Sequence, residues 1–480
     1  MFLGIDIGTS GVKSVLLAPD GSIADQSSCA LSIARPNPLW SEQDPDNWWD
    51  AVETSVARLP GDLRRRVAAI GLTGQMHGAV LLGADDRPLR PAILWNDGRS
   101  AAECLELERA EPRLRAITGN IAMPGFTAPK LLWTRRNEPD LMAKVRTILL
   151  PKDYVRLCMT GDKASDVSDS AGTLWLDVAG RRWSPAMLGV SGVDISQMPV
   201  LFEGTAVTGR LRREVAARWG MECVPVAAGG GDNAAGAAGM GAISDGDAIL
   251  SLGTSGVTFV VTDGFKPNPD QGVHAFCHCL PDRWHLMAVH LSAASCLDWA
   301  AVQFGLAGAA EVAELARRTV PGTGSELFLP FLSGERTPHN DPRLKAGFLG
   351  MDHDTTPSRL AVAVLEGVAF SHAEGLAALR SAGARIDRLT MIGGGARSGT
   401  WGSIFASLFG LPIDYPAQAE VGPAYGAAKL GQLAATGASP EEICTKPSIR
   451  ETVDPDPDLA ARLEDKFARY RSAVPAAGRA

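Results

Sequence analysis

The sequence predicts an α/β protein made of two duplicated domains with a cleft between them. The first observation is a repeat: "DIGTSGV" at residues 6–12 returns as "SLGTSGV" at residues 251–257, so each half of the 480-residue chain carries one copy near its start. The second observation is that strand-like segments precede helical ones in both halves. The third is the length, which exceeds one ordinary core. We therefore expect domains at 1–245 and 246–480.

Turn signals divide both halves into elements. In the first half "FLGIDIG", "VKSVLLA" and "SIADQSSCALSI" predict an antiparallel meander, a helix is expected from about Pro45, and "VAAIGLTGQ" is typical of a buried strand. In the second half "DAILSLGTSGVTFVVTDG" predicts a hairpin, "GVHAFCHCL" and "RWHLMAVHL" predict strands, and "SAASCLDWAAVQFG" predicts a helix. Finally, "LTMIGGGARSGTW" predicts a strand, a glycine turn and a helix from about Ser398.

Composition and charge exclude several classes of function. Hydrophobic residues make up 45% of the chain and charged residues 21%, which is typical of globular proteins in water. With a net charge of -8 and no run of Lys and Arg, we expect no nucleic-acid partner. "MFLGIDIG" does not resemble a targeting peptide, and the longest weakly polar stretch contains Asp232, so we expect no membrane partner. Eight cysteines without a CxxC pair indicate reduced thiols in the cytoplasm.

The segment "HAFCHC", residues 274–279, is a candidate metal site by residue type alone. In a strand, however, successive side chains face opposite ways, so its histidines and cysteines do not converge on one ion. We interpret it as an ordinary strand that carries small thiols.

Each GTSG turn is suited to binding phosphate. Its glycines let an anion approach the backbone, and its hydroxyl and amide groups offer several hydrogen bonds without adding charge. One such turn is more often a plain hairpin, but two at equivalent places could hold opposite sides of a triphosphate. A third glycine turn could hold a nucleotide face, although a tight crossover is the structural alternative. The candidate nucleotide-binding residues are Gly8, Thr9, Ser10, Gly253, Thr254, Ser255, Gly394, Gly395, Ala396 and Arg397.

Two carboxylates are candidates for chemistry. Asp6 is present only in the first copy of the repeat, where it would repel a nucleotide unless a divalent cation stood between them, so we expect Mg²⁺ there, held through water. Asp232 follows three glycines at the start of a predicted helix. It is either a helix N-cap or a base that accepts the proton of an attacking hydroxyl. Three glycines are a costly way to start a helix and leave the carboxylate open to a ligand, which favours the role of a base.

Polar and aromatic residues that follow a buried strand are candidates for a sugar site. Met76 and His77 come first, although a lone histidine at a strand end is more often structural. Further along, Trp95, Asn96, Asp97 and Arg99 combine an aromatic plane with fixed polar groups, which suits a sugar. "RPNPLWSEQDP", around Trp40, and "SGERTPHNDP", around Arg336, have the same character. We interpret both of these as surface loops.

At these residues the sequence resembles the FGGY family of carbohydrate kinases, over essentially the whole chain. The blocks that carry the resemblance include "DIGTSGVK", "GQMHGA", "RPAILWNDGR", "GGGDNAAGA", "LSLGTSGV", "FLSGERTPHN" and "IGGGARS". The resemblance implies two actin-like ATPase (ribonuclease H-like) domains. It is strongest to members that act on D-xylulose, and it implies transfer of the γ-phosphate of ATP to the 5-hydroxyl of that sugar, in xylose catabolism, with Mg²⁺ as cofactor.

Carried over residue by residue, the resemblance assigns roles to the candidates. Asp232 would accept the proton of the sugar hydroxyl, and Asp6 would lie near Mg²⁺. Met76, His77, Asp232 and Asn233 would contact the sugar. The two GTSG turns would hold the ATP phosphates, and the third glycine segment would line the adenosine.

Other functions stay open at this point. One is a kinase of the same family that acts on ribulose, glycerol or another polyol, because a single side chain can decide such a preference. Another is a nucleotide-driven switch or filament protein of the actin type, and a third is a sugar-binding regulator without catalysis. A homodimer is expected only because soluble enzymes often form one.

Overall fold

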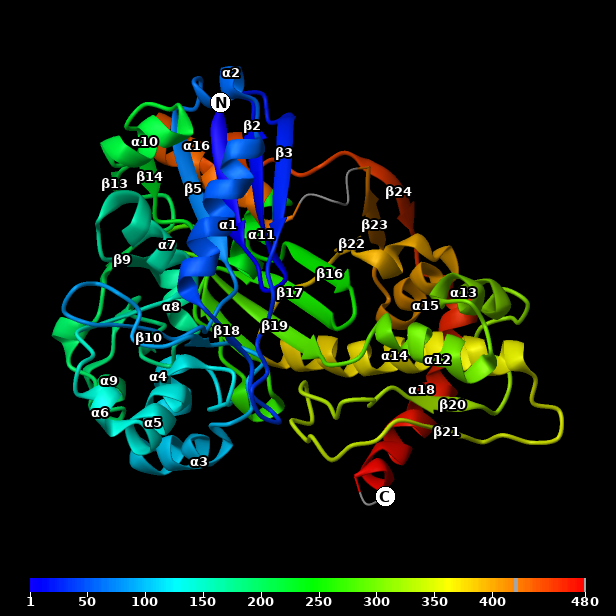
Figure 1. Cartoon of the computed structure of the whole chain (residues 1–480). Helices are drawn as coiled ribbons and strands as arrows, with labels where there is room; N and C mark the ends of the chain where they lie inside the picture. Colours follow the sequence, from blue (N-terminus) through cyan, green and yellow to red (C-terminus); the bar gives the residue numbers. More distant parts are fainter. Residues whose placement is uncertain (418–421, 479–480) are drawn as a thin grey trace.

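The computed structural model describes residues 1–417 and 422–478 and contains two large sheets with helices packed against them (Figure 1). The first sheet has the order β13-β14-β5-β1-β2-β3, with β15 paired to β5, and the second has the order β18-β19-β17-β16-β22-β23-β24. The first-sheet strands are β1 (Phe2–Ile7), β2 (Gly11–Leu17), β3 (Ile23–Ala30), β5 (Ala69–Gly74), β13 (Val207–Arg210), β14 (Pro225–Ala227) and β15 (Gly230–Gly231). The second-sheet strands are β16 (Ala248–Leu252), β17 (Gly256–Thr262), β18 (His274–Cys277), β19 (Trp284–His290), β22 (Leu389–Ile392), β23 (Ile413–Pro416) and β24 (Ile449–Val453).

The helices connect these strands and cover the sheets. In the first half they include α1 (Pro45–Arg58), α3 (Ala101–Ala110), α5 (Thr127–Asn137), α7 (Pro151–Thr160), the short α8 (Val167–Ala171), α10 (Arg213–Trp219) and α11 (Asp232–Gly239). In the second half they are α12 (Ser295–Phe304), α13 (Ala309–Ala316), α14 (Pro357–Ser381), α15 (Gly399–Phe409), α16 (Pro423–Thr436) and α18 (Pro457–Ala477).

The duplicated plan expected from the repeat is confirmed. β1 and β2 form an antiparallel hairpin, and β5 lies parallel on the other side of β1. In the second half β16 and β17 form the equivalent hairpin, and β22 lies parallel to β16. The meander, the helix from Pro45 and the helix after Ser398, which caps α15 through its side chain, are also where the sequence placed them. Both GTSG turns therefore stand at the same point of equivalent sheets.

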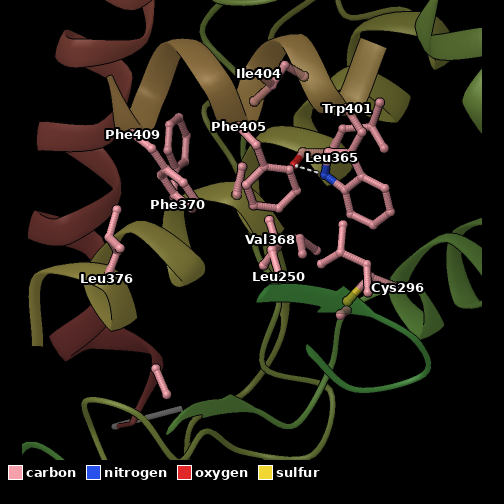
Figure 2. Packing of buried hydrophobic residues seen from close by; sticks show 14 of the residues in the cluster. Leu250, Cys296, Leu365, Val368, Phe370, Leu376, Trp401, Ile404, Phe405 and Phe409 are labelled. Atoms are coloured by element: carbon pink, nitrogen blue, oxygen red, sulfur yellow. Dashed lines mark hydrogen bonds between the residues drawn. The ribbon is translucent and has the colours of Figure 1, made fainter. Parts of the chain in front are cut away.

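The core of the second half is built around α14. Leu365 and Phe370 on α14 pack with Trp401, Phe405 and other side chains of α15 (Figure 2), and the indole N–H of Trp401 donates to the carbonyl of Leu365 at 3.0 Å. By length and composition α14 could cross a membrane, but 78% of its most apolar 18-residue window is buried inside the protein. Its apolar character is that of a central core helix.

The two halves are joined by α16, which comes late in the chain but packs on the first sheet and on α11 (Figure 1). At Gly71 an added Cβ atom would lie 1.8 Å from the carbonyl oxygen of Ala427, and at Gly426 it would lie 1.7 Å from the carbonyl oxygen of Ala235. These are backbone contacts that no larger side chain allows. The division between residues 245 and 246 stays a prediction, because α16 belongs to the second half by sequence and to the first sheet by contact.

We expect Gly426→Ala to lower the free energy of unfolding by about 3 kcal/mol or more, because the new methyl group must displace the backbone of α11. Urea unfolding followed by tryptophan fluorescence measures this. Gly189→Ala is the matched control, since a Cβ atom there meets nothing within 4 Å, and this control should leave stability unchanged or slightly raised. Equal stability of the two variants would contradict the packing described for α16.

Candidate active site

A cavity of about 240 Å³ lies between the two halves of the chain. The first half contributes Met76, His77, Trp95, Met123, Gly125, Phe126, Asp232 and Asn233, and the second half contributes Ser255, Val257, His274, Phe276, Met287, Val289 and Arg336. Met76, His77, Trp95, Asp232 and Asn233 are in this lining, together with Ser255 from the second GTSG turn, whereas Asn96, Asp97 and Arg99 are not. Their role in binding a sugar stays a prediction.

His77 presents a hydrogen-bond acceptor to the cavity. It follows β5 with a positive φ of 71°, and its Nδ1 lies 2.6 Å from the carbonyl oxygen of Gly172. Because a carbonyl only accepts, Nδ1 carries the proton and Nε2 is left as an acceptor. Burial is the largest cause that lowers the pKa of His77 to about 3, so the ring is neutral at physiological pH.

Asp232 stands at the start of α11, directly after β15, and Asp6 is on β1; the charge of Asp232 acts on the Asp6 carboxyl, so the two groups lie near each other. Asp232 is the first residue of α11, while Gly231 occupies the cap position, so the N-cap interpretation is not supported. One oxygen of Asp232 accepts from the backbone and side-chain amides of Asn233 at 2.8 and 2.9 Å. Burial raises the pKa of Asp232 to about 6, and burial together with the charge of Asp232 raises the pKa of Asp6 to about 7. The two carboxylates therefore share one poorly solvated space.

Buried polar groups hold the backbone that leads to Asp232. The guanidinium of Arg156 donates to the carbonyl of Ala227 at 2.8 Å, and the hydroxyl of Ser168 accepts from the amide of Gly231 at 3.1 Å. Behind them, the fully buried ammonium of Lys152 lies 2.8 Å from a carboxylate oxygen of Asp166, which caps α8. These hydrogen bonds hold the backbone at both ends of the segment that contains the three glycines, residues 229–231.

A buried amide network connects the first GTSG turn to the cavity wall. Trp95 donates its indole N–H to the hydroxyl of Thr9 at 2.9 Å, and that hydroxyl donates to Gln75 at 2.9 Å. The side-chain amide of Gln75 donates to the side-chain oxygen of Gln43 at 2.9 Å, and the side-chain amide of Gln43 donates to the backbone carbonyl of Thr9 at 2.7 Å. Trp48 completes the network by donating to Gln43 at 3.0 Å.

The interpretation of the Trp40 segment as a surface loop is wrong for its second part. Glu42 and Gln43 are buried, and Glu42 is paired with Arg99 at 2.8 Å. The guanidinium of Arg99 also stacks 3.6 Å from the ring centre of Trp40. This segment supports the loop that carries Trp95, and sequence reasoning missed it because polar residues next to proline are typical of exposed loops.

The interpretation of the Arg336 segment as a surface loop is also wrong at Arg336 itself, which lines the cavity. Sequence reasoning missed the aromatic wall as well, formed by Phe126, His274 and Phe276 with ring centres 5.6 to 6.2 Å apart. "HAFCHC" supplies part of this wall: the strand ends at Cys277, and within residues 1–417 and 422–478 no group of three or more metal-ligating side chains converges.

A second cavity, of about 710 Å³, is formed by the third glycine segment, by α15 and by residues of α12 and α13. Gly394, Gly395 and Arg397 line it, and Asp298 and Arg317 are among the other lining residues. Gly394, Ala396 and Arg397 also border a wider cavity of about 1070 Å³ that reaches Lys13 on β2. The glycine segment is therefore open to ligands on two sides.

Sequence profiles of known families match both halves of the chain. The N-terminal domain of the FGGY family of carbohydrate kinases matches residues 1–239, and the C-terminal domain of that family matches residues 248–435. The chain belongs to the FGGY family of carbohydrate kinases. Its fold is accordingly the actin-like ATPase fold of that family, and the expected fold class is confirmed.

Individual FGGY kinases are similar over their full length. A xylulose kinase of Escherichia coli (strain K12) is 53% identical over 98% of both chains, and a xylulose kinase of Bacillus subtilis (strain 168) is 36% identical over 94% of this chain and 91% of its own. Among solved structures, a xyloylose kinase from Brucella ovis superposes with a TM-score of 0.96 at 48% identity and covers 99% of both chains.

We expect Gln43→Met to lower the free energy of unfolding by about 2 to 4 kcal/mol, because it leaves the indole N–H of Trp48 and the amide of Gln75 without their buried acceptor. Thermal and urea unfolding measure the change. Gln303→Met, at an exposed position of α12, is the control and should lie within about 0.5 kcal/mol of the parent. A neutral Gln43→Met would show that the amide network contributes nothing to holding the turn.

Proposed function

We propose that this FGGY kinase transfers the γ-phosphate of ATP to the 5-hydroxyl of D-xylulose, in the use of xylose as a carbon source. The observation that carries the proposal is the cavity between the halves, in which the Asp232 carboxylate lies beside Met76, His77, Trp95 and Asn233. The similar proteins named xylulose kinase, at up to 53% identity, support the choice of sugar.

In this proposal Asp232 is the base. Its carboxylate is fixed by Asn233 and lies in the same lining as the sugar-facing groups, so a bound hydroxyl can donate its proton to it. The acceptor Nε2 of His77 takes a hydrogen bond from another sugar hydroxyl, and the faces of Met76 and Trp95 cover the carbon chain. Because the protein mainly orients the reactants, most of the rate gain comes from position and electrostatics.

The nucleotide would be held by backbone on both sides of the cleft. The turns at Gly8–Ser10 and Gly253–Ser255 offer amide and hydroxyl donors to phosphates. The glycine segment at 393–397 and the cavity of about 710 Å³ would receive the adenosine.

Asp6 fits the Mg²⁺ that such a kinase uses. Its Oδ1 is buried and has no hydrogen-bond partner among the residues that the structure describes, as expected for an oxygen that serves a cation or the water bound to one. When bound, Mg²⁺ would neutralise charge on the phosphates during transfer. The role of Asp6 is to provide a negative charge next to the first phosphate turn. A cytoplasmic location and a homodimer stay predictions.

An ADP-release assay with Mg-ATP tests the substrate, using D-xylulose, D-ribulose, L-ribulose, glycerol and no sugar. We expect strong turnover with D-xylulose only. A preference for another acceptor would change the assigned sugar but keep the kinase function. No turnover with any of the acceptors would contradict the kinase function.

Asp232→Asn should lower kcat by about 10²- to 10⁴-fold, because it removes the proton acceptor but keeps the shape of the side chain. The Kd for D-xylulose, measured by calorimetry, should change by less than about threefold, since the contacts of the ground state remain. Asp465→Asn, at an exposed position of α18, is the control and should leave kcat unchanged. Near-normal kcat in Asp232→Asn would refute the assignment of the base.

The pH dependence should report the two raised pKa values. Both carboxyls must be ionised to act, so kcat/KM should fall as the pH drops through about 7 and then more steeply below about 6. An ordinary aspartate would remain ionised down to about pH 4. The profile is measured with both substrates well below saturation, so that the free protein titrates. A flat profile between pH 5 and 8 would contradict the buried environment of both carboxyls.

A further inference from the structure

Arg336 enters the cavity from the second half of the chain on a firmly held loop. The amide of Thr337 donates to the carbonyl of Val289 at 3.1 Å, and the hydroxyl of Thr337 accepts from the amide of Val289 at 3.0 Å and donates to Gly272 at 2.8 Å. Val289, on β19, is itself part of the cavity lining. The position of the guanidinium is therefore set by the sheet and not by a loose surface loop.

The guanidinium of Arg336 makes no ion pair with a carboxylate in residues 1–417 and 422–478. The neighbouring Glu335 uses its carboxylate elsewhere: one oxygen accepts the amides of Leu291 and Arg336 at 2.9 and 2.8 Å, and the other accepts the hydroxyl of Ser371 at 3.0 Å. Burial is the largest cause that lowers the pKa of Arg336. A poorly solvated cation without a partner carboxylate is costly to keep, which suggests that a ligand uses it.

A neutral histidine orients the guanidinium. Asn120 donates its amide hydrogens to the carbonyls of Thr118 and Ala275 at 2.8 and 3.0 Å, so its oxygen accepts from Nδ1 of His274 at 2.8 Å. Nε2 of His274 is then an acceptor, and it lies 3.4 Å from one terminal nitrogen of Arg336. A guanidinium has five N–H donors, so most of them remain for a ligand.

The cavity is consequently divided by hydrogen-bond chemistry. Asp232 and His77, from the first half, present acceptors, whereas Arg336 presents only donors. The charge of Arg336 also acts on both His77 and His274, which places it on the histidine side of the cavity. A sugar bound across this space offers hydroxyl hydrogens to the acceptors and must offer oxygen lone pairs to the guanidinium.

We propose that Arg336 binds the ketone oxygen of the sugar and so selects a ketose over the corresponding polyol. A carbonyl oxygen only accepts and has two in-plane lone pairs that suit the guanidinium fork. A hydroxyl in its place brings a hydrogen of its own that must find another acceptor, and Nε2 of His274 already faces Arg336. The inference rests on the proposed function and adds to it the residue that recognises the ketone oxygen of the sugar.

The test compares D-xylulose with xylitol, in which that ketone is reduced, for the parent protein and Arg336→Gln. Arg336→Gln should lower kcat/KM for D-xylulose by about 10- to 100-fold, mainly through KM, because a charge-assisted hydrogen bond to the sugar is lost. The value for xylitol, already low in the parent, should change by less than about threefold. Arg336→Lys keeps the charge without the fork and should recover part of the loss.

Arg343→Gln is the matched control, since Arg343 lies on the same segment, is largely exposed and pairs with Asp341 at 2.9 Å. It should leave the ratio of the two acceptors unchanged. Equal losses of kcat/KM for D-xylulose and xylitol in Arg336→Gln would overturn the inference, because a residue that only supports the fold affects both acceptors. Thermal unfolding shows whether the variant has lost stability.

Calorimetric binding without nucleotide separates this inference from the proposed function. D-xylulose that binds the parent at least tenfold more tightly than xylitol, with the preference lost in Arg336→Gln, supports the role of Arg336 even if no phosphate is transferred. Equal binding of the two compounds by the parent overturns it, whatever the turnover.

Discussion

The close approach of α16 to the first sheet is the constraint on which the site depends. Gly4 and Gly71 in the sheet and Gly426 in the helix leave room for backbone contacts that a single methyl group would prevent. The opposite face of this helix, at Gly426, packs on α11, which begins with Asp232. Because the chain returns to the first sheet at α16 and then rejoins the second sheet at β24, the two halves cannot separate without breaking this packing.

The electrostatics of the cleft oppose stability and favour ligands. Burial raises the pKa of Asp232, burial together with the charge of Asp232 raises the pKa of Asp6, and Arg336 is partly buried without a carboxylate ion pair in the described part of the chain. Each of these groups would be better solvated on the surface. Keeping unpaired charge of both signs in one cavity is typical of a functional site, where a bound substrate and cation provide the missing partners.

The sequence predicted much of the site because the relevant residues stand at strand ends and turns. Met76 and His77 follow β5, and Asp232 follows three glycines, so local patterns were enough to select them. Gln43 and Arg336 were assigned to surface loops. Their local sequences, rich in proline and polar residues, are those of exposed segments, and their burial depends on contacts with residues far away in the chain, Thr9 for the first and Val289 for the second.

By itself, therefore, the sequence determined the duplicated α/β architecture, the two GTSG turns and the candidate carboxylates Asp6 and Asp232, because repeats, periodicity and turn residues act over short distances along the chain. Only the tertiary structure decided which loops line the cavity and that α16 crosses to the first sheet. It also decided that donors and acceptors are separated across the cleft. Those features depend on burial and on contacts between residues up to hundreds of positions apart, which no local pattern encodes.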